Sequence, residues 1–217
     1  MTKYEKISVL ARETAKRISA NREEWIRYLD VASRLYKYPF EDQILIYAQR
    51  PDATACASLE MWNEKMFCWV NRGAKGIALL DGESERPRLR YVFDVTDVHK
   101  AKRIGRDPFI WHLREEHKEA VLAGLEHIYG STNDSLSFES RIYEIAAGIA
   151  EDFYEEAVDE VIDAAANSFL EDLDGDVVSV RFREMLVQSV SYIVLKRCGC
   201  DMTEFADDFT FDYIHEF

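Results

Sequence analysis

Aromatic and basic residues gather between residues 50 and 93 in a combination that suits binding of a polyanion. Arg72 and Lys75 lie in the glycine-containing segment Asn71–Gly76, and Trp62 and Trp69 precede it. Cations pair with phosphate groups and unpaired bases stack on rings, so this combination is typical of surfaces that bind single-stranded nucleic acid. The alternative is that the rings form the core and the cations only solvate a turn. The candidate DNA-binding residues are Arg50, Trp62, Trp69, Arg72, Lys75, Arg88, Arg90 and Tyr91.

A second segment is strongly acidic, because residues 142–180 contain no Lys or Arg. Its acids recur four residues apart, and like charges at that helical spacing repel each other by a few tenths of a kcal/mol per pair. One interpretation is a solvated face that aids solubility. The other is a surface for a basic partner, either a protein or a DNA-binding groove for which the acids imitate phosphates. The candidate protein-binding residues are Glu151, Asp152, Glu155, Glu156, Asp159 and Glu160.

Known catalytic and metal-binding motifs are missing from the sequence. There is no G-x-S-x-G, phosphate-binding loop, G-x-G-x-x-G or H-E-x-x-H pattern. His112 and His117 are five residues apart, and Cys198-Gly-Cys200 has no second pair at ligand spacing. Aligning residues 172–176 with a calcium loop puts non-acidic residues at its first and last positions. We therefore expect no catalytic residues, no metal, no cofactor and no small-molecule substrate, and hence no enzyme.

Composition bounds the class of protein. The 217 residues are 47% apolar and 31% charged, with 9 Gly and 4 Pro, which excludes a disordered or collagen-like chain. The sequence has no apolar run long enough to span a bilayer and no apolar signal core near Met1. Four cysteines do not make a disulfide framework in a chain of this length. We expect a globular cytoplasmic protein that does not enter membranes.

Hydrophobic periodicity predicts an α+β fold: N-terminal helices with a small three-stranded antiparallel sheet, followed by an acidic helical bundle. Helices are expected at 3–19, 21–36 and 41–49, strands at 67–70, 76–80 and 89–93, and helices again from residue 111. Gly and Asn in 71–76 and 81–87 favour two hairpin connections between the strands. The β-branched stretch 177–182 is assigned to a helix. We expect two domains, 1–108 and 109–217.

The two halves of the chain differ in charge. Residues 1–110 hold 20 Lys and Arg against 16 Asp and Glu, a net charge of +4. Residues 111–217 hold 7 basic and 25 acidic residues, a net charge of -18. A difference of this size predicts two functional surfaces.

Three motifs in the first half resemble a known family: Gln43–Gln49 (QILIYAQ), Leu59–Trp62 (LEMW) and Val70–Ile77 (VNRGAKGI). Together they resemble the N-terminal domain of ArdC-type anti-restriction proteins, over about residues 1–100. The resemblance implies single-stranded DNA binding, with contacts through Arg72 and Lys75. The family's basic turn differs from this one at Asn71 and Ala74. Residues 111–217 do not carry the zinc motif of the ArdC protease-like domain, so protease activity is not implied.

Further motifs lie mostly in the second half: Trp111–His117, Leu125–Gly130, Ser168–Glu171 and Arg197–Gly199. They resemble the opening region of very large proteins with helicase-like and methylase-like modules, encoded on conjugative elements of Gram-positive gut bacteria. This resemblance implies a fragment or a free-standing relative of such a protein.

These observations lead to three functional hypotheses. The first is a non-enzymatic accessory or anti-defence protein of a mobile genetic element that binds single-stranded DNA through its ArdC-like half. The alternative is an inhibitor of a host defence nuclease, a restriction or CRISPR effector, which it binds through the acidic helical face as a DNA mimic. The third is a folding or docking module of a larger polypeptide. The expected partner is accordingly single-stranded DNA or a defence nuclease.

Overall fold

The computed structural model describes residues 1–82, 87–101, 107–108, 110–166 and 168–216. The chain forms two compact units, Met1–Trp111 and His112–Phe217. The first unit contains helices and a small antiparallel sheet, and the second is helical, which confirms the predicted α+β class.

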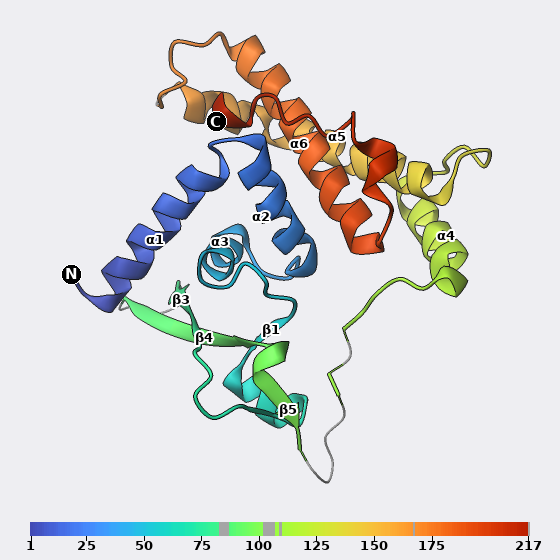
Figure 1. The fold of residues 1–217 in the computed structure, drawn as a ribbon. Helices are drawn as coiled ribbons and strands as arrows, with labels where there is room; N and C mark the ends of the chain where they lie inside the picture. Colours follow the sequence, from blue (N-terminus) through green and yellow to red (C-terminus); the bar gives the residue numbers. More distant parts are fainter. Residues whose placement is uncertain (83–86, 102–106, 109, 167, 217) are drawn as a thin grey trace. The chain divides into compact units, whose positions relative to one another are not determined.

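Three helices build one layer of the first unit: α1 (Lys3–Ile18), α2 (Arg22–Arg34) and α3 (Phe40–Gln49). They lie on one side of the strands (Figure 1). The predicted cap at Asn21 is confirmed, because its side-chain oxygen accepts a hydrogen bond of 3.0 Å from the backbone N–H of Glu24. Pro39 precedes the first residue of α3, where a fixed φ and a missing N–H are tolerated.

The main sheet contains β1 (Cys56–Ser58), β3 (Ile77–Asp81) and β4 (Arg88–Asp94), antiparallel in the order β1-β4-β3. Ile77, Leu79 and Val92 alternate along β3 and β4 and are almost completely buried. Because alternate strand residues share a face, these side chains form the core face of the sheet toward the helices. The sheet therefore holds the β3–β4 hairpin rigidly against the helical layer.

One predicted strand pairing is wrong. The strand expected at 67–70 forms β2 (Cys68–Val70), but it pairs with β5 (Val98–Lys100) in a separate two-stranded ribbon, and β1 is the third strand of the sheet. The segment Asn71–Gly76 is therefore not a hairpin turn. The outer edge of β3 is already occupied, because the side chain of Gln49 donates to the carbonyl of Ala78 at 2.8 Å and accepts from its N–H at 3.0 Å. Because the backbone N–H and C=O of Ala78 are both hydrogen-bonded to Gln49, β2 cannot form ladder hydrogen bonds with β3 at this residue.

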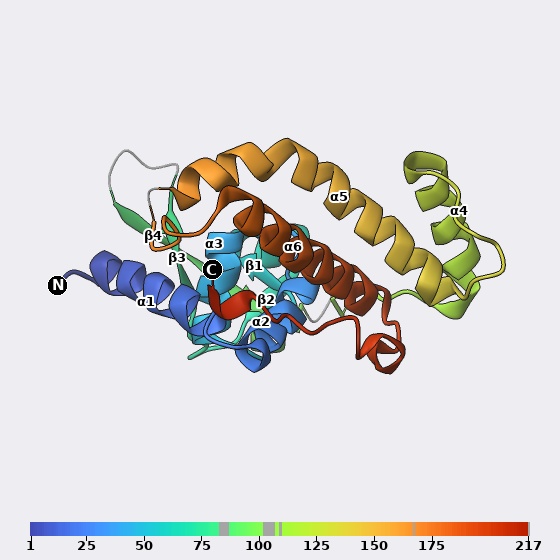
Figure 2. The same cartoon turned by 90° about the horizontal axis from the view of Figure 1, so that it is seen from above.

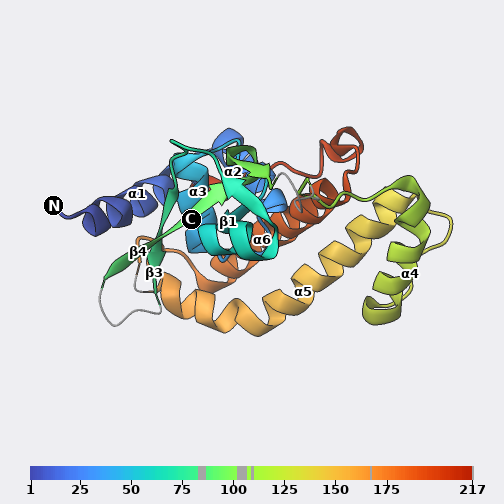
Figure 3. The ribbon, with the colours of Figure 1, turned by 90° about the horizontal axis from the view of Figure 1, so that it is seen from below.

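The second unit contains α4 (Lys118–Tyr129), α5 (Phe138–Ala165) and α6 (Gly175–Cys198). Helices α5 and α6 run side by side (Figure 2), and α4 packs against α5 (Figure 3). Residues 177–182 lie within α6, as predicted. Helix α6 ends at Gly199, whose φ of +72° is the left-handed conformation that terminates many helices.

The chain after α6 closes the core of this unit with aromatic rings. Phe205, Phe209 and Phe211 are buried. The ring of Phe205 stacks on Tyr143 of α5 with centroids 5.4 Å apart, and Phe209 meets Tyr192 of α6 edge to face at 5.3 Å. Such ring pairs stabilise a core beyond the area that they bury.

Short helical turns connect the longer elements. They are η1 (Met61–Lys65, π-type), η2 (Val95–Asp97), η3 (Glu115–His117), η4 (Met202–Phe205) and η5 (Ile214–Glu216). Among the helices that the structure describes, none has the length and apolar character needed to cross a bilayer.

Candidate nucleic-acid interface

The β2–β5 ribbon carries exposed rings at its centre and at one end. Trp69 of β2 lies opposite His99 of β5, and the side chain of Trp69 is 49% exposed whereas the preceding Cys68 is fully buried. The ribbon thus has an inner and an outer face, with Trp69 and His99 on the outer one. Phe67 precedes β2, is 45% exposed, and its carbonyl accepts a hydrogen bond of 3.0 Å from the N–H of Ala101.

The segment Asn71–Gly76 follows the other end of β2 and carries two exposed cations. Gly73 has a φ of +89°, a conformation that side chains rarely adopt. A Cβ on Gly76 would lie 3.1 Å from the ring of Phe93, so glycine is needed for this close approach. Arg72 and Lys75 are exposed and form no ion pair with any residue that the structure describes.

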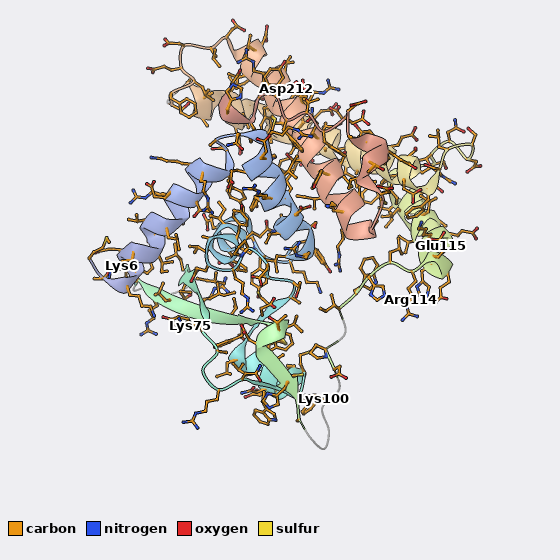
Figure 4. All side chains as sticks on the ribbon, in the orientation of Figure 1. Lys6, Lys75, Lys100, Arg114, Glu115 and Asp212 are labelled. Atoms are coloured by element: carbon orange, nitrogen blue, oxygen red, sulfur yellow. The ribbon has the colours of Figure 1, made fainter. Side chains whose placement is uncertain are left out.

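We call the exposed residues of the ribbon and this turn the ribbon surface. It comprises Phe67, Trp69, Arg72, Lys75 and His99. Lys75 lies beside the β3–β4 strand pair, and Lys100, the last residue of β5, lies at the far end of the ribbon (Figure 4). Three of the eight predicted DNA-binding residues, Trp69, Arg72 and Lys75, are thus exposed within one short segment, residues 69–75.

Trp62 does not belong to this surface, and its prediction as a stacking residue is wrong. Its side chain is 3% exposed, and its indole N–H donates to the carbonyl of Phe93 at 2.8 Å. The ring fills the space between η1 and β4, so it is a core residue. A base has no access to it in this fold.

Two of the predicted phosphate ligands are engaged by carboxylates instead. Arg50 forms an ion pair with Asp97 and a hydrogen bond of 2.7 Å with Thr96. Arg90 forms an ion pair with Asp42, whose side chain is 6% exposed. Burial raises the pKa of Asp42, although the charge of Arg90 acts in the opposite direction. Removing either arginine would leave a carboxylate without its counter-charge, so both are structural rather than free to bind phosphate.

Tyr91 and Arg88 occupy intermediate positions. Tyr91 is 38% exposed, but Lys3 donates to its hydroxyl at 2.7 Å and its ammonium lies 4.9 Å from the ring centroid. One edge of that ring is therefore already covered. Arg88 is exposed, but it pairs with Asp81 at the opposite end of the β3–β4 hairpin from Gly76. Four strand residues correspond to about 13 Å, so Arg88 lies away from the ribbon surface.

The acidic residues predicted on the second unit all lie on α5. Glu151 is engaged, because Arg183 of α6 donates to both of its carboxylate oxygens at 2.6 Å. This bidentate pair raises the pKa of Arg183 and orients the two helices. The other five are exposed and form no ion pair with residues that the structure describes: Asp152, Glu155, Glu156, Asp159 and Glu160.

Phe67 and His99 belong to the ribbon surface but were not among the predicted DNA-binding residues. Phe67 has a φ of +52°, which is uncommon for an aromatic residue and has no signature in the sequence. His99 lies 30 residues after Trp69 in the chain, and only the pairing of β2 with β5 places them together. The polar neighbours of Val98 give no strand signal for β5, so the sequence does not reveal this pairing.

No group of three or more His, Cys, Asp or Glu side chains within the described residues is arranged to hold a metal ion. Comparison of the chain with protein-family models, curated proteins and solved structures finds no match.

Proposed function

We propose that residues 1–111 bind single-stranded DNA without catalysing a reaction, in a non-enzymatic accessory or anti-defence protein of a mobile genetic element. The DNA-binding and anti-restriction part of this proposal comes from the resemblance of Val70–Ile77 and the neighbouring motifs to ArdC-type proteins, and the mobile-element setting comes from the resemblance of the second-half motifs to proteins of conjugative elements. The site is the ribbon surface, in which cations bind phosphate and rings accept bases.

One observation carries this proposal. Arg72 and Lys75 are exposed without a carboxylate partner among the described residues, three and six residues after the half-exposed Trp69 in the chain. Elsewhere in the first unit Arg50 and Arg90 are neutralised by Asp97 and Asp42, so cations are not uniformly free on this unit. An unneutralised pair next to an exposed ring is what a single strand requires.

Replacing Arg72 and Lys75 together by alanine tests the site. Exposed charge pairs contribute about 0.2–1 kcal/mol each, so we expect the dissociation constant for a single-stranded oligonucleotide to rise roughly 2- to 30-fold. The slope of log K against log salt should become shallower by about 1.4, since each lost phosphate contact removes roughly 0.7. Anisotropy titrations at several salt concentrations measure both quantities.

Arg12→Ala with Lys16→Ala is the matched control. Both residues are exposed on α1, and the double change alters net charge by the same amount. An equal loss of affinity in the control would assign binding to overall charge, and unchanged titrations for Arg72→Ala/Lys75→Ala would remove the site.

A second candidate function is inhibition of a host defence nuclease through the acidic face of α5. The observation that favours it is the row of five exposed acids on α5, none of which forms an ion pair among the described residues. Their mutual repulsion destabilises the helix. A row of this kind complements a basic DNA-binding groove. Glu151 is excluded from this face, because Arg183 already occupies its carboxylate.

Charge reversal distinguishes this function from DNA binding. In cells that restrict unmodified plasmid, the wild-type protein should raise the transformation efficiency. The double variant Glu155→Lys/Asp159→Lys should transform more than tenfold less efficiently than wild type, because the reversed charges repel a basic groove. Glu171→Lys with Asp172→Lys is the control, since both residues are exposed outside α5 and the charge change is equal. Protection that survives reversal on α5 but is lost in the ribbon-surface double variant favours the first function.

A further inference from the structure

The outer face of the β2–β5 ribbon presents a row of rings. Trp69 and His99 are directly opposite each other, with Phe67 two residues earlier at the end of the ribbon. Neither Phe67 nor Trp69 stacks on another ring within the described part of the chain. Large rings are mostly buried in folded proteins, so adjacent exposed rings on one short ribbon indicate a binding surface.

Two of these rings are oriented by their surroundings, His99 by a side-chain hydrogen bond and Phe67 by its backbone conformation. The Nδ1 atom of His99 lies 2.7 Å from the side-chain oxygen of Asn71. Because an amide oxygen only accepts hydrogen bonds, Nδ1 is the donor and the imidazole plane is fixed relative to Trp69. Phe67 has the positive φ described above, and uncommon backbone conformations of this kind cluster where a side chain is aimed at a ligand. An ordered set of rings loses little conformational entropy when a ligand binds.

Cations flank the rings at both ends of the ribbon. The N–H of Asn71 donates to the carbonyl of Asp97 at 2.8 Å, which closes one end of the ribbon, and Arg72 is the next residue. Lys65, the last residue of η1, is exposed two residues before Phe67 at the other end. From Cys68 to Val70 the strand spans about 7 Å. The order along the ribbon is thus cation, rings, cation, which matches phosphates on either side of stacked bases.

We propose that the ribbon surface recognises its ligand through unpaired nucleobases that stack on Trp69, His99 and Phe67, with Arg72 and Lys65 holding the flanking phosphates. This inference rests on the proposed function and identifies the part of the ligand that is bound. Stacking accepts any base, because every base has an aromatic face. A duplex is not a ligand for this surface, since its bases are already stacked inside the helix. Met61 and Met66, near the ribbon, are also exposed and would suit an apolar protein partner. The experiment must therefore distinguish base recognition from binding of a protein.

The experiment removes bases while keeping phosphates. A labelled thymidine homopolymer and a strand of equal length composed of abasic nucleotides carry the same charge. For wild type we expect the abasic strand to bind roughly 5- to 150-fold more weakly for each stacked base. In Trp69→Ala this ratio should shrink at least about fivefold, in Trp69→Phe it should be largely retained, and in Lys65→Ala both strands should weaken alike.

Phe153→Ala is the control, because Phe153 is a 55% exposed ring on α5 of the other unit. The inference is confirmed if the base-dependent ratio falls in Trp69→Ala, Phe67→Ala and His99→Ala but not in Phe153→Ala. Equal affinity of wild type for the two strands would overturn base recognition while leaving DNA binding intact. Failure of wild type to bind either strand would instead overturn the proposed function and favour a protein partner for these rings.

Discussion

At the scale of single residues, Asp94 is a buried charge that organises the first unit. Its side chain is 1% exposed. One carboxylate oxygen accepts hydrogen bonds from the N–H groups of Thr54 (2.7 Å) and Ala55 (3.1 Å), and the other accepts from the N–H (3.0 Å) and hydroxyl (2.8 Å) of Thr96. Asp94 therefore ties the start of β1 to the end of β4, immediately before the β5 strand of the ribbon.

Asp94→Asn should destabilise the protein by about 2–4 kcal/mol, because the amide nitrogen cannot accept the bonds and leaves buried donors unsatisfied. Burial by itself raises the pKa of Asp94, but hydrogen bonds from Thr96, Thr54 and Ala55 outweigh it and hold the pKa below its ordinary 3.8. The ionised carboxylate thus contributes stability above pH 3.8, which is lost as pH falls through the lower folded pKa. Chemical denaturation at several pH values measures this loss of stability. The part contributed by the Asp94 carboxylate should be absent from the Asp94→Asn variant.

Asp52→Asn is the comparison for this prediction, since the Asp52 side chain is 80% exposed and its ion pair with Arg50 is long, at 3.6 Å. Exposed pairs of this geometry contribute little, so we expect a change below about 0.5 kcal/mol. An Asp94→Asn variant as stable as Asp52→Asn would contradict the assigned role.

At the scale of elements, the motif Gln43–Gln49 positions α3 through two side-chain amides. Gln43 donates to the carbonyls of Leu35 and Tyr38, so it fixes the connection between α2 and α3. Gln49 closes the outer edge of β3 through Ala78. Gln43 and Gln49 are thus structural residues, and Gln49 occupies the strand edge that a β2–β3 pairing would need.

Gln49→Ala should therefore lower the free energy of unfolding by about 1–2 kcal/mol. The reason is that the backbone N–H and C=O of the buried Ala78 both lose their hydrogen bonds to the Gln49 amide. Hydrogen exchange at the Ala78 amide should accelerate by a larger factor than exchange at the Leu79 amide. Gln49→Met, which keeps the length of the side chain without its amide, should behave like Gln49→Ala; full stability in the methionine variant would show that packing, not hydrogen bonding, matters there.

At the scale of the whole molecule, charge is divided between the two units. The chain has a net charge of -14, although its first 110 residues have a net charge of +4. Long-range repulsion from the acidic half opposes the approach of DNA, but charges farther apart than about 8–10 Å are largely screened at physiological salt. Binding then depends on the local surface that the ligand touches, which is why Arg72 and Lys75 matter more than the total charge.

The amino-acid sequence by itself determined the elements of this protein. Periodicity, caps and glycines predicted α1, α2, α3 and α6, the antiparallel neighbours β3 and β4 and the α+β class, because each of these signals acts over a few residues, whereas most of the predicted connection at 81–87 lies outside the described residues. The basic turn around Arg72 and the acidic row on α5 could also be identified, since charge clusters are visible in the linear chain.

Only the tertiary structure decided which side chains remain available. Trp62 and Trp69 are seven residues apart and equally aromatic, yet one fills the core and the other faces outward. Arg50 and Arg90 are neutralised by carboxylates from distant segments, and Trp69 meets His99 only because β2 pairs with β5. Burial, ion pairing and strand pairing all depend on residues far away along the chain, and local sequence signals do not contain that information.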